Sequence, residues 1–143
     1  MEIESYPDIE GGLRTWLRAD AALVALVGQR VFFGVPRGAV DATFPLVTIQ
    51  RVGGGQDPSE VPIDLALIQV DAWGTAADKG GKAVAWAVVN ALRSRLETMR
   101  DRTTLATGID AFGAEVVGVV WAPDPADDRP RYSLSVEVTG ISS

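Results

Sequence analysis

The residue types that most often do chemistry in proteins are sparse in this chain of 143 residues. It contains no cysteine and no histidine, which excludes disulfides, thiolate zinc sites, cysteine nucleophiles and Ser-His-Asp triads. Carboxylates are the groups left for acid-base chemistry. Asp64 and Asp71 stand an odd number of residues apart on one predicted strand, so their side chains point to opposite faces. They cannot form a catalytic pair with each other.

Asp71 lies on the same face of that strand as apolar neighbours, which is unusual company for a carboxylate. The other residues of this face are Leu65, Leu67, Gln69 and Trp73. A covered or interfacial site is one interpretation. Because aspartate is mostly exposed in folded proteins, we expect instead that Asp71 marks a sheet edge facing water.

Three further aspartates, Asp124, Asp127 and Asp128, fall within the proline-bearing stretch Pro123–Pro130. The stretch lacks the ligand spacing and the glycine of a calcium-binding loop. It predicts a solvated turn between two strands.

The stretch Gly74–Ala83 is rich in glycine and lies between a predicted strand and a predicted helix, where a phosphate-binding loop would lie. From Gly74, the second glycine of that motif would fall at Lys79. Lys82 is followed by Ala83, where the motif needs serine or threonine. The stretch therefore predicts the start of a capped helix and not a nucleotide site.

Trp86 falls on the polar side of that helix. Its neighbours there are Lys82, Asn90, Arg93, Glu97 and Arg100. Tryptophan beside arginine is typical of interface anchors, whereas a second layer of the same chain could also cover the ring. Subunit contact and internal burial both remain open for Trp86.

Composition indicates an ordinary globular domain, with 47% hydrophobic and 22% charged residues. The net charge of −6 and the pI near 4.6 predict no basic surface for nucleic acid. The N-terminus is acidic, unlike a secretory signal, and the longest apolar stretches are too short to cross a membrane. We expect synthesis in the cytosol.

The pattern of apolar residues predicts three helices. They are a helix opened by a capping box at Ser5–Asp8 and running to about Ala19, a shorter one capped by Asp20 and ended by Gly28, and a long one from a capping box at Thr75–Asp78 to about Arg100.

Five strands are predicted, at Arg30–Phe33, Pro45–Val52, Ile63–Trp73, Glu115–Ala122 and Arg131–Thr139. Glu115–Ala122 is apolar on both faces and is expected to be central. Gly53–Pro62 holds three glycines and two prolines, which predicts a flexible arm. The order is α-α-β-β-β-α-β-β. This order predicts an α+β fold: a mainly antiparallel sheet of about five strands, a long helix on one face and an N-terminal helical pair.

Four segments in this order resemble the tail terminator or tail-completion proteins of phages with long, non-contractile tails, a family related to the lambda tail terminator. The segments are Leu17–Phe32, Phe44–Ile49, Gln69–Gly74 ahead of an alanine-rich helix, and Arg131–Val138. The resemblance implies a single tail-terminator-like domain over residues 1–143. The Pro123–Asp128 loop and the Gly53–Pro62 arm have no counterpart in the family pattern.

The resemblance implies a structural virion protein with no enzymatic activity, no cofactor and no bound metal. It implies a homo-oligomer, a hexameric ring, that caps the tail tube, ends tube polymerisation and presents the surface that joins the head or neck. The implied partners are the tail tube protein and the head-tail connector or neck protein. DNA passes through the ring without sequence-specific binding, and no membrane is involved. The implied location is the head-proximal end of the tail in the virion, after assembly in the host cytoplasm.

Two groups of residues are assigned hypothetical roles. The subunit or tube interface is assigned to Trp86, Arg93, Asp71 and, from the arm, Gln56, Asp57 and Glu60. The acidic loop with Asp124, Asp127 and Asp128 is assigned to the channel wall. Six copies of the chain, each with a net charge of −6, would total about −36 around the channel and would repel phosphate. Two alternatives remain: a head-completion or neck adaptor protein, and a small acidic ligand-binding or hydrolytic domain that uses Asp64, Asp71 or this loop.

Overall fold

The computed structural model of the protein describes residues 6–56 and 63–142. The helices in these ranges are α1 (Ile9–Arg18), α2 (Ala21–Val27) and α3 (Gly81–Glu97), with short 3-10 helices η1 (Asp41–Thr43) and η2 (Ala77–Lys79). The strands are β1 (Val31–Phe32), β2 (Leu46–Gln56), β3 (Ile63–Trp73), β4 (Arg100–Ala106), β5 (Ile109–Trp121) and β6 (Arg131–Ser142).

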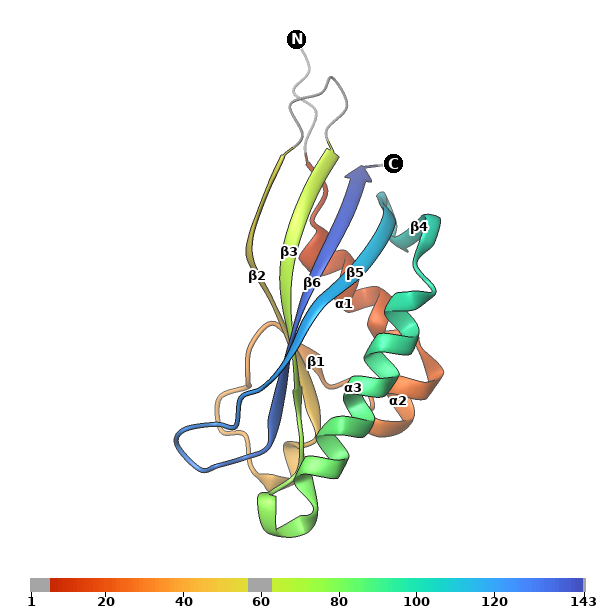
Figure 1. The fold of residues 1–143 in the computed structure, drawn as a ribbon. Coiled ribbons are helices and arrows are strands. Elements are labelled where there is room, and N and C mark those ends of the chain that lie inside the picture. Colours follow the sequence, from red (N-terminus) through yellow and green to blue (C-terminus); the bar gives the residue numbers. More distant parts are fainter. Residues whose placement is uncertain (1–5, 57–62, 143) are drawn as a thin grey trace.

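The strands form one sheet in the order β1-β2-β3-β6-β5-β4. β1 runs parallel to β2, and the other neighbouring pairs are antiparallel. The helices pack on one side of this sheet, which we call the helix face, and the other side is the open face (Figure 1). The loops 33–45 and 122–130 lie on the open side, over one end of the sheet (Figure 1). The predicted α+β class is confirmed.

The hydrophobic core fills the space between the helix face and the helices. Every second residue of β3 from Asp64 to Ala72 is buried, and these residues point toward α1 and α3. The helices contribute Ile9, Leu13 and Leu17 from α1 and Val88, Leu92 and Leu96 from α3. α1 approaches β6 so closely that a Cβ at Gly140 would collide with the Ile9 side chain.

The first helix begins three residues later than predicted. Its cap is Asp8, whose carboxylate accepts from the Gly11 N–H at 3.0 Å, and Ser5 lies outside the described residues. The second helix follows the prediction: Asp20 accepts from the Leu23 N–H, and the N–H of Gly28 donates to the carbonyl of Val24. Gly28 has a φ of 60°, a backbone angle that glycine adopts without a Cβ clash.

The predicted capping box at Thr75–Asp78 is wrong. α3 begins at Gly81, after η2 and after Gly80 in the left-handed conformation. A Cβ at Gly81 would collide with the Thr75 carbonyl, so the glycine permits a tight turn that replaces a side-chain cap. Within the described residues, the buried Thr75 hydroxyl has no hydrogen-bond partner.

The predicted arm is wrong for its first four residues, because β2 continues to Gln56. Gly53, Gly54 and Gly55 pair with β3 beyond a register shift at Arg51/Gly53. Gly54 has a φ of 96°, and a Cβ there would collide with the Leu65 carbonyl. The glycines therefore let the strand bulge and continue, where we had predicted that they would end it. The rest of the predicted arm lies outside the described residues.

The C-terminal half contains a strand that the sequence did not predict. α3 ends at Glu97, and Arg100 opens β4, where a continuing helix had been expected. β5 begins at Ile109, six residues before the predicted start. Its half from Ala114 to Trp121 pairs only with β6 among the described residues, so the predicted central position is wrong for this segment. The central strands are β3 and β6.

Candidate interaction surfaces

Asp64 forms an ion pair on the helix face of the sheet. Its carboxylate accepts from both terminal nitrogens of Arg51, with Nη2 at 2.7 Å from Oδ1, and hydrogen bonding to Asp64 raises the pKa of the Arg51 guanidinium. Glu10 of α1 accepts from the Arg51 backbone N–H at 2.6 Å. Asp64 thus joins β3 to β2, and the Glu10 bond joins the same residue of β2 to α1. As predicted, its side chain lies on the face of β3 opposite to that of Asp71.

Asp71 is buried, contrary to the expectation of a water-facing edge. Only 8% of its surface is exposed, because β3 lies between β2 and β6 and the two loops cover this end of the open face. Both carboxylate oxygens accept from the Gln69 amide at 3.1 Å. Next to it, the Trp73 indole donates to the Thr48 hydroxyl at 3.0 Å. A buried Asp71 cannot be part of an exposed interface surface.

The acidic loop is organised by Arg129, which is 8% exposed. The guanidinium donates to the Asp41 carboxylate at 2.6 Å, lies 3.7 Å from the Asp127 carboxylate and stacks 3.8 Å from the centre of the Phe44 ring. Hydrogen bonding to Arg129 lowers the pKa of Asp41. Asp124 accepts from the Ala126 N–H at 2.9 Å. These contacts hold the loop against the 33–45 loop.

Four exposed aspartates near Arg129 line a cavity of about 400 Å³. The cavity is lined by Asp41, Ala76, Ala77, Asp78, Asp127, Asp128 and Arg129. In residues 6–56 and 63–142, no group of three or more carboxylates is arranged to hold a metal ion. Asp128 differs from Asp124 and Asp127, because its side chain has no hydrogen bond within the described ranges.

Trp86 shows features of both interpretations that the sequence left open. Its ring packs edge-on against Tyr132 at a centroid distance of 5.1 Å, and Tyr132 in turn contacts Trp121 at 5.0 Å. Nevertheless, 41% of Trp86 is exposed. The Lys82 ammonium lies 4.7 Å from the centre of the Trp121 ring. Arg93, seven residues after Trp86 on α3, is also exposed. The aromatic cluster therefore covers only one side of Trp86.

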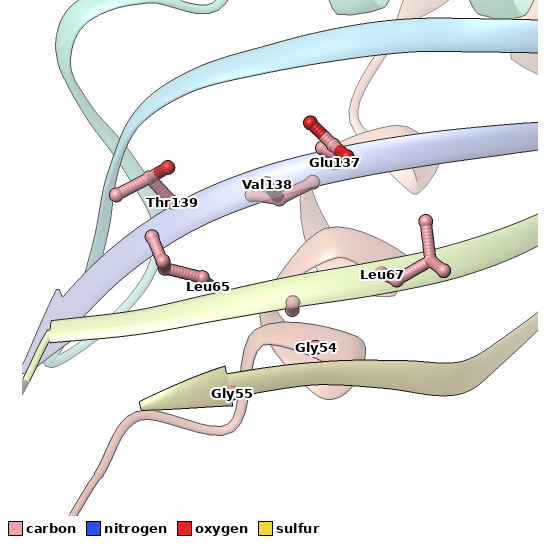
Figure 2. Close-up of a pocket in the computed structure, with 8 residues that line it drawn as sticks. Gly54, Gly55, Leu65, Leu67, Glu137, Val138 and Thr139 are labelled. Atoms are coloured by element: carbon pink, nitrogen blue, oxygen red, sulfur yellow. The ribbon is translucent and has the colours of Figure 1, made fainter. Parts of the chain in front are cut away.

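A groove on the uncovered end of the open face was not predicted from the sequence. Its volume is about 350 Å³, and it is lined by Gly54, Gly55, Leu65, Ala66, Leu67, Glu137, Val138 and Thr139. Figure 2 shows Leu65 and Leu67 rising from β3 on the same side as Glu137 and Thr139 from β6. Leu65 is 46% exposed, although it is a large apolar residue. Because Gly54 and Gly55 have no side chains, the groove stays open along β2.

Glu137 faces a like charge across the sheet. The register of β5 and β6 places Glu115 directly opposite Glu137, and both side chains are exposed. The alternation in β6 predicted that Glu137 points away from the core, but its pairing with Glu115 depends on the register shift at Val116/Gly118. No pattern within either strand alone could have shown that pairing.

The remaining predicted interface residues lie at the end of β2 or beyond it. Gln56 pairs through its backbone with Asp64, and its side chain is not among those described. Asp57 and Glu60 lie outside the described residues. Among the residues described, no helix is both long and apolar enough to span a membrane.

Comparisons with known proteins identify relatives of the chain. A family model described as "Tail completion protein gp17" matches residues 11–118, from α1 into β5. No curated protein matches the chain. Among solved structures, a chain from "Virion of native gene transfer agent (GTA) particle" is similar, with a TM-score of 0.66 and 23% sequence identity. That match covers 96% of this chain and 100% of the other, and at this identity it shows a shared fold.

Proposed function

The chain belongs to the tail completion protein gp17 family, and on that premise we propose that it forms a hexameric ring that caps the tail tube. Membership makes it a structural protein of a phage-type virion. In this proposal the ring ends tube polymerisation at the head-proximal end of the tail and presents the surface that meets the neck. Its partners are the tail tube protein on one side and a head-tail connector on the other.

The observation that carries the proposal is the family match over residues 11–118, which spans the helices and most of the sheet. The match with a chain of a gene transfer agent particle extends the same fold over 96% of the chain. The surface described above supports an assembly role, because it offers a half-exposed tryptophan and an apolar groove. Exposed apolar surface marks interaction sites, and tryptophan is enriched among the residues that dominate protein contacts.

Electron microscopy of tail tubes grown with and without the protein tests this function. We expect rings at one end of each tube and a narrow distribution of tube lengths when the protein is present. Tubes that elongate equally in its presence would refute termination. A protein that binds only to purified connector and ignores tubes would establish the neck adaptor role in its place.

The acidic loop remains our candidate for the channel wall, where its charge keeps DNA from adhering. Asp128 is the sharpest position for a test, because Asp127 and Asp124 also hold the loop together through hydrogen bonds. Particles with Asp128→Lys should eject DNA more slowly than wild type, and the difference should shrink at high salt. Arg37→Lys, which keeps the charge of an exposed loop residue, is the control. Unchanged ejection by D128K would remove the loop from the channel wall.

A further inference from the structure

Within residues 6–56 and 63–142, Glu115 and Glu137 form a charged pair without a counter-ion. They stand opposite each other on β5 and β6, and neither has an ion pair or hydrogen bond in the parts of the chain described. Like charges directly across two strands are destabilising. The apolar groove with Leu65 and Leu67 begins beside Glu137. This end of the open face therefore suits a partner that brings both a cation and a large apolar side chain.

α3 carries such a combination on the other layer of the molecule. Its exposed stripe consists of Lys82, Trp86, Asn90, Arg93 and Glu97, which fall within about 80° of one another at 100° per residue. The helix holds three cations and one carboxylate, in a chain whose net charge is −6. The helix stripe and the open face therefore differ in sign of charge.

The spacing of the two surfaces also agrees. Trp86 and Arg93 are separated by about 10.5 Å along the helix axis, at 1.5 Å per residue. Leu67, Glu137 and Glu115 lie on three successive strands, so the span from Leu67 to Glu115 is about 9.6 Å at 4.8 Å per strand. An aromatic ring in the groove thus places the arginine over the two carboxylates.

We propose that the exposed stripe of α3 in one copy docks on the open face of the next copy. Trp86 enters the groove beside Leu65 and Leu67, and Arg93 lies against Glu115 and Glu137. This inference rests on the proposed ring and specifies its subunit contact. Because the contact joins two different surfaces on opposite layers, it is head-to-tail, and it repeats around a ring until the ring closes. Tryptophan and arginine anchors are the residues that most often dominate such contacts.

Charge reversal at the two ends of the contact provides the test. Arg93→Glu and Glu137→Arg should each raise the concentration for half-maximal assembly by about tenfold or more. The double variant should assemble as the wild type does. An equimolar mixture of the two single variants should also assemble, because alternating copies restore opposite charges at every contact. Arg37→Glu and Asp78→Arg are controls that change the same charges at exposed positions elsewhere.

Assembly is measured by native mass spectrometry and sedimentation of the free protein, and by microscopy of protein bound to tubes. Circular dichroism of each variant shows whether it has folded, and the mixture experiment remains informative because both of its components must be folded to assemble. Single variants that assemble normally, or a double variant no better than either one, would overturn the proposal. Loss of assembly by E137R with no effect of R93E would also overturn it and assign the groove to a different protein.

The result is separable from the test of tube capping. Rings that depend on the Arg93–Glu137 pairing but leave tube length unchanged would keep the contact and refute termination. Capped tubes whose rings are insensitive to both charge reversals would keep termination and refute the contact. A wild-type protein that is monomeric both in solution and on tubes would refute the contact as well.

Discussion

The two faces of the sheet differ in how completely the chain covers its own surface. On the helix face, every second residue of β3 from Asp64 to Ala72 is buried. On the open face, exposure along the same strand falls from 46% at Leu65 to 7% at Trp73. The helices bury their side of β3 from Asp64 to Ala72, whereas two loops bury only one end of its other side. Stability thus comes from the helix face and the loop-covered end, and the remaining surface is available for a partner.

The largest effect on the free energy of unfolding should come from truncating a side chain in the core between the helix face and the helices. Leu92→Ala removes a fully buried side chain of α3 and should lower the free energy of unfolding by about 2–5 kcal/mol. Leu65→Ala makes the same chemical change on the open face, where the effect should be about 0.5 kcal/mol or less. Urea denaturation followed by circular dichroism measures both. Equal losses would show that the open end of the sheet is covered in solution.

A smaller loss is expected at the loop-covered end of the open face. Thr48→Val keeps the shape of the side chain but leaves the buried Trp73 indole N–H without its acceptor. Such an unpaired group costs about 1–3 kcal/mol. Thr107→Val, at an exposed turn, is the matched control. If the two variants unfold at the same urea concentration, water reaches the Trp73 indole N–H and replaces the lost acceptor at this end of the open face.

The contact between the two covering loops should respond to acid. The Arg129 hydrogen bond lowers the pKa of Asp41 from its ordinary 3.8, so ionised Asp41 stabilises the fold above that pH. This contribution is lost as the pH falls through the lower pKa of the folded state. Asp41→Asn should therefore have a lower melting temperature than wild type at pH 7, and the difference should close below pH 3.8. Because the Asp41 side chain is largely exposed, the effect should be smaller than those in the core. A difference that is independent of pH would contradict the assignment.

The smallest effect has the opposite sign and belongs to the uncovered end. Glu137→Gln removes one member of the like-charge pair and should raise the free energy of unfolding of the isolated chain by about 0.2–0.5 kcal/mol. The gain should vanish in high salt, which screens the repulsion in the wild type. Glu97→Gln on α3 changes the same charge away from this pair. A wild-type chain as stable as E137Q at low salt would mean that Glu115 and Glu137 do not repel each other.

Much of the fold follows from local patterns in the sequence. The bounds of β3 match the alternation from Ile63 to Trp73, and the Asp20 and Gly28 signals place α2. The errors arise where contacts between distant segments decide the structure. The glycines at 53–55 predict the end of a strand, but their pairing with β3 lets β2 continue past them. The polar start of β4 gave no strand pattern, and β4 is held by its pairing with β5 and by the packing of the buried Leu105 against α1.

Local sequence patterns could predict only part of the candidate surfaces. Trp86 could be identified because its helical position depends on the residues of one helix. The burial of Asp71 depends on two loops far away in the chain, and Arg129 joins them by contacts that no spacing rule contains. The pairing of Glu115 with Glu137 depends on strand register, which is a property of two segments together.

The irregularities in β2 and β5, whose long free parts form the edges of the sheet beyond β1 and β4, have a consequence for how growth can stop. A straight, unpaired strand recruits another strand through its backbone, and each addition exposes a fresh copy of the same edge without limit. In β2 the edge is interrupted by the shift at Arg51/Gly53, and the Arg51 N–H is already occupied by Glu10. At the opposite edge of the sheet, β5 is interrupted by the shift at Val116/Gly118. The sheet is thus a poor template for copying itself, and in the ring proposed above association is left to side chains, whose geometry sets a finite number of copies.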